Sequence, residues 1–200
     1  MKKTIFIVLT FLSIQAFSQQ NDAYKEFIDK AKKEAIVDGQ DMEVYDLLND
    51  FYEQVLQSDS GELNPDMATR IQHFYENKEA KNKHLLVMFL GYQEYISATT
   101  QARQRLDGDF QKSLLDDLEH EIEKTYGKVP VLIHIYKAEA LRSAGNVEDA
   151  KKTISDALKN FPNSVPLKVY SYVDSMNEDL KMDLIKNHSN HWMVKQFGIK

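Results

Sequence analysis

The sequence predicts an all-α protein, and three observations support this. The 200 residues contain only 7 glycines and 4 prolines, well below average usage of about 7% and 5%. Apolar residues recur three and four positions apart along most of the chain, which is the period of a helix with one buried face. Charged residues make up 28% of the chain and hydrophobic residues 42%, so each helix can have a solvated face as well. The length fits one domain or slightly more, at roughly 150 residues a domain.

The first 18 residues have the features of an export signal. Two lysines follow Met1, an apolar run covers residues 5–12, and the small residues Ala16 and Ser18 form a small-x-small cleavage pattern. The run is shorter than the roughly 20 residues that a membrane-spanning helix needs. We therefore expect residues 1–18 to be a signal peptide, with a buried N-terminal helix as the alternative. The mature protein is then expected to be soluble, in the periplasm or outside the cell, with no transmembrane segment.

Charge and cysteine content exclude several classes of function. Loss of the two lysines of the signal changes the formal net charge from −6 to −8. An acidic chain without a basic stripe lacks the electrostatic footprint of a nucleic-acid-binding protein and the basic patch of an anionic-membrane binder. The absence of cysteine excludes a disulfide scaffold, a thiol nucleophile, a cysteine-ligated zinc site and a lipoprotein.

Residues 19–80 form an N-terminal region of three predicted helices. Asp38-Gly39 ends the first helix, Asp41 can cap the second, and residues 58–66 form the most loop-like segment of the chain. The apolar stripes of the three helices cover residues 24–36, 44–56 and 67–74.

Residues 81–200 are predicted to form helical hairpins. Residues 85–96 are apolar on more than one face, so we expect a central helix packed on both sides rather than a buried strand. Asp107-Gly108-Asp109 breaks the chain before the next helix. Further apolar stripes cover residues 110–122, 131–141, 147–161 and 166–185, with a tight turn at Gly145-Asn146 and a stop at Pro162.

Residues 131–164 resemble a tetratricopeptide repeat, a 34-residue helix-turn-helix unit. The chain has His134 and Lys137 where the family usually has tryptophan and leucine. Residues that match the family pattern are Ala138, Leu141, Gly145, Ala150, Ala157 and Phe161 to Ser164. The resemblance implies an α-solenoid in which degenerate hairpins flank this repeat, and an irregular helical bundle is the alternative.

The resemblance also implies a function and a set of site residues. Arrays of this kind bind a peptide or a partner helix on the concave surface formed by their first helices. The positions that would face this groove are Leu132, Ile135, Glu139, Arg142 and Ser143. Family members that clamp a C-terminal carboxylate carry lysine and asparagine where this chain has Ile135 and Glu139, so an amphipathic partner is favoured. We expect a non-catalytic binding scaffold for a protein or peptide partner in the cell envelope, with no cofactor and no metal ion.

Two other functions remain as alternatives. His188 and His191 are the only close histidine pair and could serve a small envelope hydrolase or a metal-dependent enzyme, although zinc would need a third ligand. His120-Glu121 begins like a zinc-protease motif, but Lys124 stands where the second histidine is required. The third possibility is a structural subunit in which the convex face of the array or residues 192–197 dock onto a membrane-embedded partner.

Overall fold

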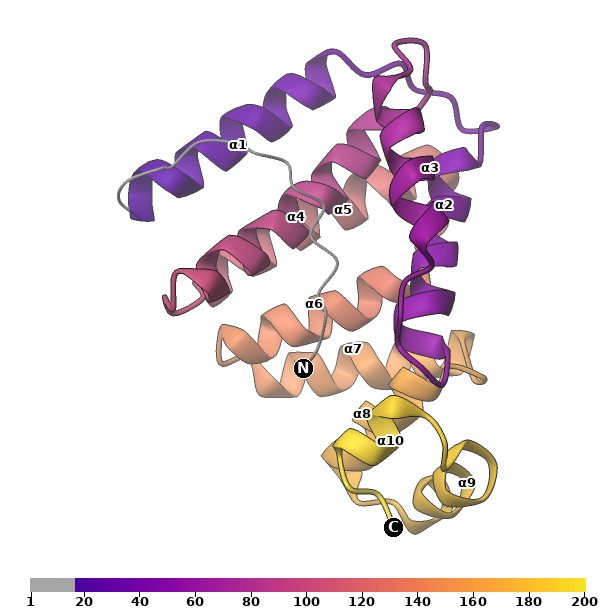
Figure 1. Ribbon diagram of the computed structural model, residues 1–200. Helices are drawn as coiled ribbons and strands as arrows, with labels where there is room; N and C mark the ends of the chain where they lie inside the picture. The colour runs from indigo at the N-terminus through magenta and orange to yellow at the C-terminus, as the bar shows by residue number, and fades with distance from the viewer. Residues whose placement is uncertain (1–16) are drawn as a thin grey trace.

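The computed structural model describes residues 17–200, in which it contains ten α-helices, one π-helical segment and no strand (Figure 1). The predicted all-α fold class is therefore confirmed. The elements are α1 (Phe17–Lys33), α2 (Glu43–Tyr52), η1 (Glu53–Gln57), α3 (Pro65–Glu76), α4 (Lys83–Gln101), α5 (Gly108–Tyr126), α6 (Val131–Ser143), α7 (Val147–Asn160), α8 (Val165–Ser175), α9 (Glu178–His188) and α10 (Trp192–Gln196).

Three helical hairpins form the body of the molecule: α4/α5, α6/α7 and α8/α9. Each helix packs on the next along the chain, and α1 extends the stack by packing on α4 (Figure 1). Asp107 caps α5 by accepting a hydrogen bond from the backbone N–H of Phe110 at 3.0 Å. Ser164 caps α8 in the same way through the N–H of Leu167. Side-chain caps of this kind satisfy the free N–H groups of a helix start.

The α6/α7 hairpin has small buried residues on both of its helices. Ala138 and Ala140 of α6 and Ala150 of α7 have almost no exposed surface. Gly145 makes the turn with φ +84°, a left-handed conformation that glycine adopts without a steric cost.

The N-terminal region departs from a simple stack of hairpins. In Figure 1, α2 and α3 run across the ends of the stacked helices instead of joining them as a further layer. α2 packs on α4 and α6, and η1 packs on α8. One apolar cluster consequently extends from Ile28 to Leu167, so the predicted regions 19–80 and 81–200 share a core. A smaller cluster holds the C-terminal helices together through Val169, Leu184 and Met193.

A polar joint connects η1 to the start of α8. The Tyr52 hydroxyl lies 2.7 Å from Gln57 Oε1 and 2.8 Å from Ser164 Oγ. Gln57 Oε1 also accepts a hydrogen bond from the backbone N–H of Val165. Burial raises the pKa of Tyr52 to about 12, which keeps its hydroxyl neutral and able to donate.

The first helix differs from its prediction at both ends. It begins at Phe17, before the predicted stripe of residues 24–36. It ends at Lys33 rather than at Asp38-Gly39, because Asn82 holds the following residues in a loop. Asn82 donates a hydrogen bond from its own N–H to the Ile36 carbonyl, and its side chain bonds Asp38 and Asp41. Residues 1–16 of the predicted export signal lie outside the described residues. Between residues 17 and 200, no helix combines the length and apolar character needed to cross a membrane.

Candidate functional site: a pocket between α4, α5 and α6

The structure divides the five predicted partner-binding residues into two groups. Leu132 and Ile135 are both 0% exposed, and they belong to the core cluster that α2 helps to form. A partner cannot touch them in this conformation, so their expected groove-facing position is corrected. These two residues are buried because α2 packs on α6. The pattern of one helix-turn-helix repeat does not indicate which other helix will cover it. Glu139 and Arg142 are partly buried and Ser143 is exposed.

Glu139 and Ser143 line a pocket of about 220 Å³ formed by α4, α5, α6 and the loop before α5. The pocket has an apolar wall with several polar groups, a composition common in ligand sites. Its lining residues are Tyr92, Gln93, Ile96, Leu106, Gln111, Tyr136, Glu139 and Ser143.

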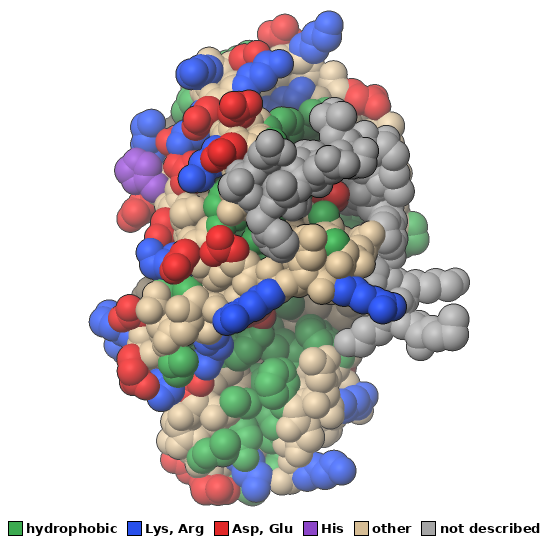
Figure 2. All heavy atoms as spheres, turned by 90° about the vertical axis from the view of Figure 1, so that its left-hand side faces the viewer, with side chains coloured by type: hydrophobic (Ala, Val, Ile, Leu, Met, Phe, Trp, Pro, Cys, Tyr) green, Lys and Arg blue, Asp and Glu red, His purple; other side chains and the backbone are tan. Residues whose placement is uncertain are grey.

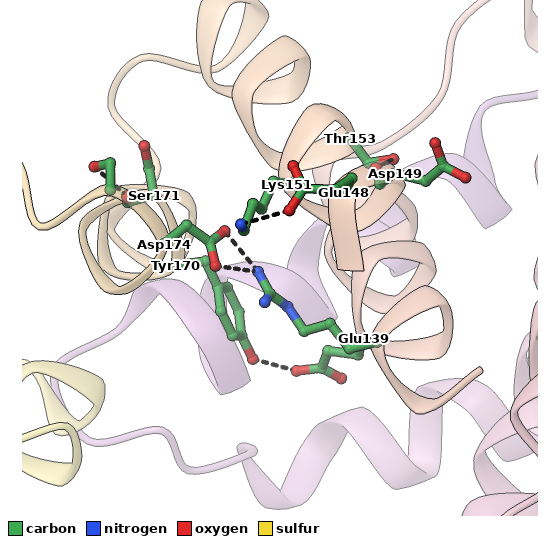
Figure 3. A network of polar contacts seen from close by, with 10 residues as sticks. Glu139, Glu148, Asp149, Lys151, Thr153, Tyr170, Ser171 and Asp174 are labelled. Atoms are coloured by element: carbon green, nitrogen blue, oxygen red, sulfur yellow. Dashed lines mark hydrogen bonds and ion pairs between the residues drawn. The ribbon is translucent and has the colours of Figure 1, made fainter. Parts of the chain in front are cut away.

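The Glu139 carboxylate is the charged group of this pocket. Its Oε1 accepts a hydrogen bond from the Tyr170 hydroxyl of α8, a contact that ties α6 to α8 (Figure 3). Burial raises the pKa of Glu139 above its ordinary value, and the Tyr170 bond and the charge of Arg142 offset only part of this rise. The carboxylate is therefore short of stabilising partners.

Arg142 is bonded to Asp174 of α8 and not to Glu139, and its buried Nε has no hydrogen-bond partner among the described residues. Arg142 Nη2 donates to Asp174 Oδ1 at 2.8 Å and to Oδ2 at 2.6 Å. The guanidinium also lies 5.9 Å from the centre of the Tyr170 ring, within the range of a cation–π contact. Figure 3 shows Asp174 and Tyr170 on the same helix, on the side that faces Glu139. Two carboxylates thus share one guanidinium, which leaves an excess negative charge beside the pocket.

Gln111 is a second polar group whose bonding is incomplete. Its side chain lines the pocket, it is 3% exposed, and its Nε2 has no hydrogen-bond partner among the described residues. A buried donor without an acceptor costs roughly 1–3 kcal/mol, so a ligand that brings an acceptor is favoured there. Sequence reasoning missed Gln111, because a lone glutamine beside an apolar stripe reads as a solvated position.

Of the two histidines considered above, His191 has a structural role. His191 is 1% exposed and caps α10. Its Nδ1 accepts from the Met193 N–H at 3.2 Å, so Nε2 bears the proton and donates to the Leu56 carbonyl at 2.9 Å. His191 therefore has no free nitrogen for a metal ion or a proton transfer in this conformation. Within residues 17–200, no group of three or more histidine, aspartate or glutamate side chains is placed to hold a metal ion.

The C-terminal segment is partly integrated into the fold. Trp192 lies against Gly61, where an added Cβ would be 2.8 Å from the indole. Phe197, Met176 and Met182 are exposed. On the face shown in Figure 2, hydrophobic side chains gather in the lower half, the part of the molecule where the C-terminal helices lie in Figure 1.

Acidification is expected to destabilise the fold through His191. Burial lowers the pKa of His191 below its ordinary value of 6.5, so the unfolded chain binds protons at a higher pH than the folded chain. The free energy of unfolding should then fall as the pH drops below about 6.5. Thermal melts at several pH values between 7.5 and 5 would measure this slope.

The matched variant for that measurement is His191→Gln. Its melting temperature should depend less on pH than that of the native chain, although a slope should persist because burial also lowers the pKa of His84 and His134. An unchanged slope in the variant would contradict the role given to His191.

Comparisons of this chain with protein-family models, with curated proteins and with solved structures found no match. The likeness to a tetratricopeptide repeat accordingly remains a resemblance of residues 131–164.

Proposed function

We propose that this protein is an exported, non-catalytic binding scaffold that holds a protein or peptide partner at the pocket between α4, α5 and α6. The observation that carries the proposal is the incomplete bonding of two polar groups there. Gln111 Nε2 has no acceptor, and the Glu139 carboxylate shares its nearest cation with Asp174. Groups of this kind are completed by a ligand that brings its own donors and acceptors.

The lining residues favour binding over catalysis. Ser143 is the one hydroxyl nucleophile of the serine or threonine type among them, and no histidine or lysine of the lining stands beside it as a base. The remaining wall consists of tyrosine, leucine, isoleucine and glutamine side chains. Aromatic side chains are enriched at interfaces between proteins.

Export is the second part of the proposal, and it is supported by the lysines, apolar run and small residues of positions 1–18. We expect the full chain, expressed with a C-terminal tag in its source cell, to be recovered outside the cytoplasm with Gln19 as its first residue. N-terminal sequencing checks this expectation. A cytoplasmic product that retains the lysines of the signal would contradict it.

Partner capture by the tagged chain tests the binding site. Ser143 is exposed at the pocket, so Ser143→Tyr should obstruct the pocket without removing a buried contact. Ser155 of α7 is also exposed, and it does not line the pocket, which makes Ser155→Tyr the matched control. We expect proteins retained by the native chain and by Ser155→Tyr to be reduced at least tenfold with Ser143→Tyr, as measured by quantitative mass spectrometry.

Equal retention by the two tyrosine variants would contradict the placement of the partner at this pocket. Circular dichroism and a thermal melt of each variant establish that both are folded before the comparison is made.

A further inference from the structure

We infer that the pocket takes a lysine side chain of the partner peptide, with the ammonium on Glu139 and the carbonyl of the same peptide residue on Gln111. This inference rests on the proposed function and specifies which chemical group the pocket recognises. It follows from the local charge, the geometry of the free oxygen, the unpaired donor and the size of the pocket.

The local charge favours a cation. Arg142 is close enough to Glu139 to act on its charge, but Asp174 takes both hydrogen bonds from Arg142 Nη2. Glu139 retains one hydrogen bond, from the neutral Tyr170 hydroxyl. A bound cation would offset the remaining negative charge, and in a partly buried site this attraction is stronger than in water.

The geometry of Glu139 favours an ammonium over a guanidinium. Tyr170 occupies Oε1, and no other donor within the described residues is bonded to Oε2. A guanidinium gains most from a carboxylate when it bonds both oxygens in parallel, whereas an ammonium acts as a compact point charge. A single free oxygen therefore suits lysine better than arginine.

Gln111 provides the second anchor. Gln111 lines the same pocket, and its Nε2 is buried beneath the pocket surface without an acceptor, a group that every peptide residue offers as its backbone carbonyl once the amide turns toward the pocket. An amine alone would leave this donor unsatisfied. The site is thus completed by one ligand that carries both a cation and a carbonyl group.

The size and walls of the pocket agree with a single side chain. Its volume of about 220 Å³ is below the range of about 300–1,000 Å³ that is usual for sites holding drug-sized molecules. Tyr92 and Tyr136 form part of the wall, where they can contact the methylene stem of lysine.

Peptide titration of the full chain, recovered after export, tests the inference. The probes are acetyl-Gly-Ala-Lys-Ala-Gly-amide and the same peptide with arginine or norleucine in place of lysine, together with n-butylamine as a free amine. Isothermal titration calorimetry should give the lysine peptide at least about tenfold tighter binding than the norleucine peptide, with the arginine peptide between them. n-Butylamine should bind more weakly than the lysine peptide.

Two pocket variants and one control separate the two anchors. Glu139→Gln keeps the side-chain shape and an acceptor for Tyr170, and it should bring the lysine peptide to the level of norleucine. Gln111→Leu should weaken all three peptides by a similar factor without changing their order. Glu148→Gln is the control, because Glu148 is an exposed carboxylate paired only with Lys151 of its own helix.

Several results would overturn the inference. They are equal binding of the lysine and norleucine peptides, tighter binding of the arginine peptide, no measurable binding of any peptide, or n-butylamine binding as tightly as the lysine peptide. The native chain alone gives these comparisons, so the test stands even if a pocket variant does not fold. Retention of a partner that Ser143→Tyr abolishes, together with no lysine preference, would leave the proposed function standing and overturn only this inference.

Discussion

Gly108→Ala is expected to destabilise the protein by about 3 kcal/mol, because no space exists for a methyl group at this position. A Cβ on Gly108 would lie 2.3 Å from the backbone nitrogen of Ala144 and 2.4 Å from the carbonyl carbon of Ser143. Both are backbone atoms at the end of α6, so the clash is relieved only by moving α5 away from α6. Urea denaturation of the native and substituted chains measures the loss.

Gly91→Ala is the matched control for this prediction. Gly91 lies inside α4 with no atom within 4 Å of the added Cβ, so alanine should stabilise the helix by roughly 0.5–1 kcal/mol. Equal urea midpoints for the two alanine variants would contradict the close packing of α5 on α6. Since Ser143 lines the pocket, Gly108→Ala should also weaken partner binding in whatever fraction remains folded.

Asn82→Ala is expected to lower the free energy of unfolding by about 3 kcal/mol, because this side chain makes three hydrogen bonds to the loop between α1 and α2. Asn82 is fully buried. Its Oδ1 accepts from the Asp38 N–H at 2.9 Å, and its Nδ2 donates to the carbonyls of Asp38 at 2.7 Å and Asp41 at 3.0 Å. Alanine would leave the Asp38 N–H and the Asp41 carbonyl without these partners, while the Asp38 carbonyl would keep its bond from the Asp41 N–H. It would also place a less tolerant residue at φ 54°.

Chemical denaturation of Asn82→Ala beside Asn190→Ala checks this expectation. Asn190 is exposed in the turn before α10, and its substitution should change the free energy of unfolding by less than about 0.5 kcal/mol. A loss below about 1 kcal/mol for Asn82→Ala would show that the loop does not depend on this side chain.

The helices could be predicted from the sequence because their signals are local. The apolar stripes, the break at residues 107–109 and the turn at Gly145 each act within a few residues, and the structure has helix boundaries close to them. The end of α1 was predicted wrongly, because Asn82 holds the loop that follows this helix through Asp38, which lies 44 residues away in the chain. The crossing of α2 over α4 and α6 could not be predicted for the same reason, since a stripe indicates a buried face without identifying its neighbour.

The candidate site could be predicted only in part. The resemblance to a tetratricopeptide repeat indicated Glu139 and Ser143, which line the pocket, but it also indicated Leu132 and Ile135, which are in the core. Gln111 of α5 and Tyr170 of α8 reach the site from other helices. The residues next to Gln111 and Tyr170 in the sequence form no pattern that indicates a site. These two side chains come close to Glu139 only because the hairpins stack on one another.

The central claim is that the partner binds at the pocket between α4, α5 and α6, and photo-crosslinking in the source cell tests it most directly. A benzophenone amino acid would replace Ser143 in one sample and Ser155 in another, since both residues are exposed and they differ in whether they line the pocket. The account predicts a discrete crosslinked partner band from position 143 that is absent from position 155. Crosslinks from position 155 alone, or from neither position, would contradict it.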